Sequence, residues 1–227
     1  MFSAFSTTKR IKSSTTLLKE YNHMRELTNE LLGGEMKDFL AGNAFQACGK
    51  KLGLLHEKTL YFNSEEELSV LADYCMFYHF VNGKNSINRF AKAKGNSLNP
   101  DTKQLLTVLQ QAEYAFLAVE RTTRHSGVIV RNIFTNQQEL LIDNGLSSSA
   151  VPGVLLASTI LRFPNFIMTT GAALSVNSII PSLENIIKKS DDLSKMSKTK
   201  KASFVAEVIK AGLQENIIQY TRQQKVA

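Results

Sequence analysis

Two short polar loops contain the side chains whose types and spacing could support chemistry. The loop at 121–127 carries Arg121, Arg124 and His125, with two residues between the arginines. Two guanidinium groups this close together can hold a phosphate or a carboxylate through paired hydrogen bonds. The pattern therefore predicts a loop that binds an anion or a nucleotide, and the competing interpretation is a solvated hairpin.

The second polar loop covers 143–149. Asp143 opens the turn signal Asp-Asn-Gly, and Ser147 begins a run of serines. A serine hydroxyl with His125 as its base would suit nucleophilic catalysis. The sequence has no nucleophile-elbow pattern, however, so we assign no catalytic residue. Because Thr169 and Thr170 close the same region, we expect any local ligand site to use the two loops and this threonine pair.

The patterns of phosphate-binding P-loops and of zinc sites are incomplete. Six residues separate Gly42 from Gly49, and Lys51 stands where a P-loop needs a hydroxyl, within a helix-like run. Cys75 and His79 share one face of a predicted helix but lack the two further ligands that zinc requires. We therefore expect no metal and no cofactor.

Positive charge is concentrated outside the central segment. The chain has a net charge of +7, whereas 113–175 contains four arginines, four acidic residues and no lysine. The C-terminal part supplies a candidate basic contact surface: Lys188, Lys189, Lys195, Lys198, Lys200 and Lys201. Such a surface permits contact with RNA or with a larger complex, and it is also typical of an ordinary solvated face.

Helical periodicity marks both ends of the chain. We expect helices over about 15–32, 36–51, 64–81, 86–94, 100–112, 176–189 and 204–223. Ser14 is the predicted first N-cap, and Ser64 with Glu67 forms a predicted capping box. This divides the chain into a disordered basic tail at 1–13, a helical region at 14–112, a β module at 113–175, and C-terminal helices at 176–227 with a basic connector at 190–203.

The β module consists of five short apolar runs at 114–119, 128–134, 139–142, 154–161 and 166–168. Tight connections favour antiparallel pairing in a curled sheet or small barrel. Several runs are apolar throughout, which indicates that both faces of the strands are covered, with helices as the cover. Burial on both faces also explains the absence of lysine. The predicted fold class is α+β.

Composition also bears on the cellular compartment of the protein. Two cysteines are too few for a disulfide scaffold, which favours a reducing, cytoplasmic compartment. The basic, serine-rich start overlaps in composition with an organelle transit peptide, and the alternative is a loose terminus. No apolar run approaches the roughly 18 residues of a membrane span.

The order of these features resembles a family of uncharacterised bacterial proteins. The resemblance covers about 38–176 and is carried by Leu-Gly-Leu-Leu at 52–55, Leu-Ala-Asp-Tyr at 71–74, Ile-Asp-Asn-Gly-Leu-Ser at 142–147 and Met-Thr-Thr-Gly-Ala-Ala-Leu at 168–174. It implies a bacterial cytoplasmic protein and no particular activity.

The sequence favours a non-enzymatic binding or adaptor protein that contacts RNA or a larger complex through its basic flanks. The C-terminal helix at 204–223 could bind a partner or form a homo-oligomer. The alternative is a small-ligand sensor or an enzyme with its site at the 121–127 and 143–149 loops.

Overall fold

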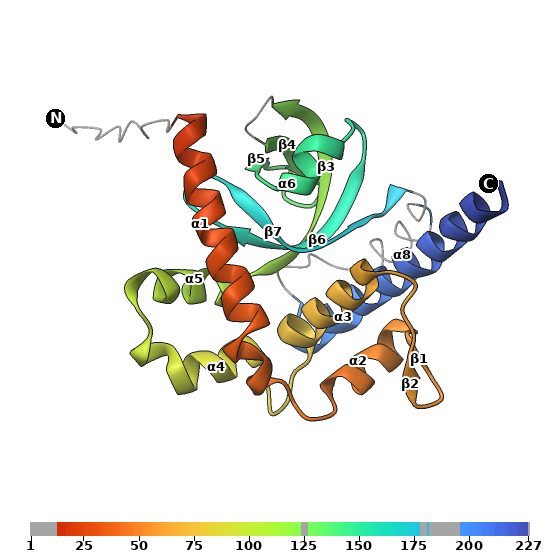
Figure 1. Cartoon of the computed structure of the whole chain (residues 1–227), viewed down its shortest axis with the longest axis horizontal. Coiled ribbons are helices and arrows are strands. Elements are labelled where there is room, and N and C mark those ends of the chain that lie inside the picture. Colours follow the sequence, from red (N-terminus) through yellow and green to blue (C-terminus); the bar gives the residue numbers. More distant parts are fainter. Residues whose placement is uncertain (1–12, 124–126, 178–180, 182–195, 227) are drawn as a thin grey trace.

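The computed structural model describes residues 13–123, 127–177, 181 and 196–226. A closed β-barrel lies against a group of helices that comes from both ends of the chain (Figure 1). The protein is therefore α+β, as predicted. The expected basic tail and most of the expected helix at 176–189 lie outside the described residues.

Helix α1 (Ser14–Gly33) matches its prediction, although Ser13 caps it in place of Ser14 and accepts a bond from the Thr16 amide. The helix expected over 36–51 is wrong, because the chain forms the 3₁₀ helix η1 (Glu35–Phe39) and then α2 (Ala44–Leu52). Arg89 donates two hydrogen bonds to the carbonyl oxygen of Phe39, which replaces the amide partner that a continuous helix would supply.

The hairpin β1 (Leu55–His56) and β2 (Thr59–Leu60) leads to α3 (Glu65–Tyr78). The expected capping box is wrong at its serine, since Ser64 makes no capping bond while Glu67 accepts a bond from the Asn63 amide at 2.7 Å. Helices α4 (Ser86–Lys94) and α5 (Pro100–Gln110) follow, joined through η2 (Gly95–Ser97), with α4 at its predicted position.

The barrel contains β3 (Glu113–Thr123), β4 (Gly127–Asn132), β5 (Gln138–Leu141), β6 (Leu155–Arg162) and β7 (Ile167–Ser175) in the order β3-β4-β5-β7-β6. The expectation of purely antiparallel pairing is wrong, because β5 and β7 are parallel, with Leu141 opposite Ile167. Strands that alternate in direction around a closed ring of five must leave one parallel pair. Closure of the barrel therefore requires the exception.

Both faces of the barrel strands are covered, as their apolar runs predict. Leu117, Val119 and Val130 belong to a cluster inside the barrel, while Tyr114 and Phe116 on the same strand belong to the core shared with the helices. The polar loop expected at 143–149 forms the short helix α6 (Asn144–Ser149), and its Leu146 packs against the interior cluster at one end of the barrel (Figure 1).

The last helix, α8 (Lys198–Val226), packs along α3 and α2 (Figure 1). It begins earlier than expected, so Lys198, Lys200 and Lys201 lie in its first turn and not in a connector. Its apolar stripe through Leu213 is buried in the protein's own core. Oligomerisation through this helix stays a prediction. Within the described part of the chain, no helix has both the length and the apolar character to cross a membrane.

Candidate functional site

A β-bulge interrupts β7 where it pairs with β6. Ser158 lies opposite Ala173 and Ile160 lies opposite Thr169. The three residues at 170–172 therefore face the single residue Thr159 across the pair. Gly171 has a φ of +108°, a value that L side chains rarely adopt. Because bulges redirect side chains and are common beside functional sites, this segment is a candidate for one.

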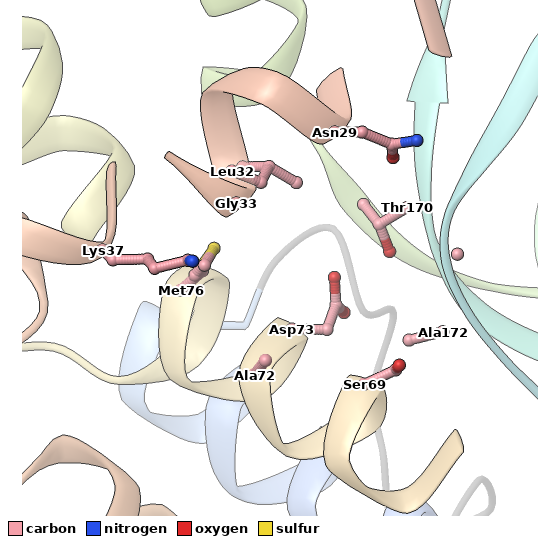
Figure 2. A pocket seen from close by; sticks show the side chains of 11 residues that line it. Asn29, Leu32, Gly33, Lys37, Ser69, Ala72, Asp73, Met76, Thr170 and Ala172 are labelled. Atoms are coloured by element: carbon pink, nitrogen blue, oxygen red, sulfur yellow. The ribbon is translucent and has the colours of Figure 1, made fainter. Parts of the chain in front are cut away.

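The bulge forms one wall of a pocket of about 380 Å³, and the other walls come from α1, η1 and α3 (Figure 2). Its polar and charged lining residues are Asn29, Lys37, Ser69, Asp73 and Thr170. The rest of the lining is small or apolar and comprises Leu32, Gly33, Ala72, Met76, Gly171 and Ala172. The pocket thus combines an apolar surface with a few polar groups, as small-molecule sites commonly do.

Asp73 is the buried acid of this pocket, with 9% of its surface exposed. Its carboxylate accepts a hydrogen bond of 2.6 Å from the Thr159 hydroxyl. The Thr170 hydroxyl and the Asp73 carboxyl group point toward each other (Figure 2). Burial raises the pKa of Asp73 from 3.8 to about 6, and the neighbouring hydroxyls of Thr159 and Thr170 oppose the rise because they stabilise the charged form. The carboxyl group is therefore mostly ionised at neutral pH.

The network continues from Asp73 toward the barrel through two tyrosines. The hydroxyls of Tyr78 and Thr159 are 3.3 Å apart, and the rings of Tyr78 and Tyr114 meet edge to face. Burial raises the pKa of both tyrosines, and the nearby Asp73 charge adds to the rise, so both hydroxyls stay protonated. The Tyr114 hydroxyl has no hydrogen-bond partner within the described residues.

A second polar cluster lies on the other side of the same bulge. The Thr169 hydroxyl donates to the Asp143 carboxylate at 2.8 Å, and Arg25 on α1 pairs with that carboxylate at 3.3 Å. The other Asp143 oxygen accepts bonds from the amides of Gly145 and Leu146. Asp143 therefore caps α6 and ties α1 to the barrel, which is a structural role.

The structure joins some of the predicted site residues and separates others. Asp143 and Thr169 are bonded to each other, while Thr170 faces the pocket. Arg121 is exposed near the end of β3. Arg124, His125 and the Ser147 side chain lie outside the described residues, although the Ser147 backbone belongs to α6. Whether these residues bind a ligand stays a prediction.

Sequence reasoning missed Asp73 and Arg25. The sequence signal for Asp73 is an acidic residue within the largely apolar run Val70–Tyr78. A helix that is buried on nearly all sides rarely contains a charged residue unless the charge has a specific role. For Arg25 the sequence holds no comparable signal, because its partner Asp143 is 118 residues away.

The remaining predicted features have simple environments. Lys198 and Lys200 are exposed and Lys201 is half-buried, while Lys188, Lys189 and Lys195 lie outside the described residues. Cys75 is buried and donates to the Ala44 carbonyl group at 3.6 Å. In the described ranges, no three His, Cys, Asp or Glu side chains gather to hold a metal ion.

Comparison with known proteins gives a family but no activity. No curated protein and no solved structure matches the chain. A family model described as "Family of unknown function (DUF7986)" matches residues 15–207. The match extends beyond residues 38–176, which carry the sequence resemblance, and covers nearly all of α1, helices α2 to α6, the whole barrel and the start of α8. The chain therefore belongs to this family of unknown function.

Proposed function

We propose that this protein binds a small polar molecule in the pocket between α1, η1, α3 and β7. The observation that carries the proposal is Asp73, a buried carboxyl group that accepts a hydrogen bond from Thr159 at a β-bulge. Burying a charged carboxylate without a cation costs several kcal/mol in principle, so a purely structural position would favour a neutral side chain. Perturbed acids in pockets are concentrated at functional sites.

The dimensions and lining of the pocket support the same function. A volume of about 380 Å³ lies within the range of sites for small ligands. Leu32, Met76 and Ala172 supply apolar contact, and Asn29, Ser69 and Thr170 supply hydrogen-bonding groups. This proposal keeps the small-ligand alternative raised by the sequence but moves its site from the two polar loops to the bulge.

A thermal-shift screen of metabolites and nucleotides tests the proposal, combined with a variant that blocks the pocket. Ser69 is exposed and lines the opening, so Ser69→Phe should fill the space with little effect on folding. Leu68→Phe on the same helix is the matched control, because Leu68 is exposed and does not line the pocket. A stabilising ligand should lose its effect in Ser69→Phe alone. A ligand whose effect disappears in Arg121→Ala and persists in Ser69→Phe would place the site at the arginine loop and contradict the proposal.

We propose as a second candidate that the basic flank contacts RNA or an acidic surface of a larger complex. Lys198, Lys200 and Lys201 occupy the first turn of α8, which contains no acidic residue. Positive charge at a helix N-terminus opposes the helix dipole, and an anionic partner would relieve this repulsion. Affinity for mixed-sequence RNA should fall steeply with salt and should weaken when these lysines become glutamine. Absence of binding at low salt would refute this candidate.

A further inference from the structure

We infer that the ligand of the α1–α3–β7 pocket carries a primary ammonium group, which binds Asp73, and a carboxylate at its other end, which binds near Lys37. The inference rests on the proposed function and adds the chemical class of the ligand. It predicts an amino-acid-like zwitterion of small size.

The pocket wall contains two charged side chains of opposite sign. Asp73 and Lys37 are the two charged residues among the lining side chains. In the part of the chain that the structure describes, none of the ion pairs includes Asp73. A carboxylate can accept about four hydrogen bonds, and the Thr159 hydroxyl supplies one of them at 2.6 Å, whereas the Thr170 hydroxyl donates to the Thr159 carbonyl group at 3.5 Å. Asp73 therefore keeps capacity for a further donor, and a cationic donor would also offset its buried charge.

The positions of the other polar groups favour an ammonium ion over other donors. An ammonium group has three N–H donors on one small centre. The Asp73 carboxyl group points from α3 toward Thr170, whose hydroxyl is also able to accept a bond (Figure 2). A neutral alcohol would donate to Asp73 without offsetting its charge, and an anion would be repelled by it. A primary ammonium group therefore fits the floor of the pocket better than an alcohol or an anion.

Lys37 indicates what lies at the other end of the ligand. Its side chain reaches the pocket from η1, on the side away from β7 and beside Met76 (Figure 2). Because Lys37 is exposed, an ion pair with it contributes less than the pair at Asp73. Leu32 and Met76 offer apolar contact for the ligand's carbon chain. The arrangement thus matches a cation at the buried end, a short aliphatic body and an anion at the mouth.

Calorimetric titration and thermal shift with three matched series of compounds test the inference. The first series contains the free α-amino acids and the straight-chain ω-amino acids from 4-aminobutyrate to 6-aminohexanoate. The second contains the corresponding amines without the carboxylate, and the third contains the corresponding acids without the amine. We expect zwitterions to bind, amines to bind a few-fold more weakly, and acids not to bind.

Two pocket variants and one control locate the contacts. Asp73→Asn should weaken binding of zwitterions and amines on the order of 30-fold or more, because it removes the charge from a buried pair. Lys37→Met should weaken zwitterions a few-fold and leave amines unchanged. Asp38→Asn, at an exposed neighbouring carboxylate, should bind like the unmodified protein. If circular dichroism shows that Asp73→Asn is unfolded, Thr170→Val replaces it as the variant at the pocket floor.

The outcomes distinguish this inference from the proposed function. Acids that bind as tightly as zwitterions, or amines that bind Asp73→Asn as tightly as the unmodified protein, would overturn the inference. If all three series fail while another metabolite gives stabilisation that Ser69→Phe removes, the inference is wrong and the proposed function stands. If no compound in either screen binds, both are wrong.

Discussion

Replacing Asp73 by asparagine should make the protein more stable at neutral pH and leave its stability nearly unchanged in acid. The reason is that burial raises the pKa of this carboxyl group from 3.8 to about 6. Between these two values the folded protein binds a proton that the unfolded chain does not, so stability falls as the pH rises from about 4 to about 6. Below about pH 4 this loss of stability is absent, and above about pH 6 it has its full size.

The size of the effect follows from the difference between the two pKa values. A difference of about two corresponds to about 3 kcal/mol in the free energy of unfolding. Asparagine removes this loss and can still accept the Thr159 hydrogen bond, although its amide group needs a new acceptor, which costs about 1 kcal/mol. We therefore expect Asp73→Asn to be about 2 kcal/mol more stable than the unmodified protein at pH 7.5 and slightly less stable at pH 4.

Urea unfolding followed by circular dichroism measures both proteins across this pH range, since the chain has no tryptophan for fluorescence. Asp38→Asn is the control, because it removes an exposed carboxylate outside the pocket. The reasoning is refuted if the stability difference between Asp73→Asn and the unmodified protein is the same at pH 4 and pH 7.5, or if it favours the variant more strongly in acid.

Three further substitutions test the geometry by the same unfolding measurement. Gly127→Ala should cost more than about 2 kcal/mol, since its Cβ would lie 2.4 Å from a backbone oxygen. Gly153 also has a positive φ but has open space around it, so Gly153→Ala should cost about 1 kcal/mol, and equal losses would contradict the clash. Asp143→Ala should cost about 2–4 kcal/mol through loss of the α6 cap and of a mostly buried ion pair, and a loss below 1 kcal/mol would show that the cluster is not structural. Tyr114→Phe should be neutral or stabilising, while Tyr78→Phe should cost about 1 kcal/mol because only the second removes a hydrogen bond; the reverse order would contradict the network.

Local signals account for the part of the fold that the sequence predicted. Helical periodicity marked α4 and α5, and the β-type apolar runs marked all five barrel strands. The continuous helix expected over 36–51 failed because a distant side chain, Arg89, satisfies the Phe39 carbonyl group and stabilises the break. A single sequence read by periodicity cannot supply such a long-range contact.

The candidate site was predicted only in part, for the same physical reason. Thr169 and Thr170 were selected because they close the β region, but their different tasks depend on the bulge, which turns one toward Asp143 and the other toward Asp73. A bulge is a matter of register between strands, and register is set by the partner strand and the packed helices. The spacing of residues along β7 does not reveal it.

Stability and binding together separate a functional role for Asp73 from a structural one. If the carboxylate only positioned Thr159 and the bulge, asparagine would lower stability or leave it unchanged, and ligand binding would follow stability. If Asp73 binds a ligand, asparagine should instead raise stability and weaken ligand binding. The reason is that the charge that costs about 3 kcal/mol in the protein without ligand is the charge that attracts a cation. Domains are stable by only about 5–15 kcal/mol, so a loss of this size is substantial. A bound ammonium ion would offset it, and the ligand should therefore stabilise the unmodified protein far more than Asp73→Asn.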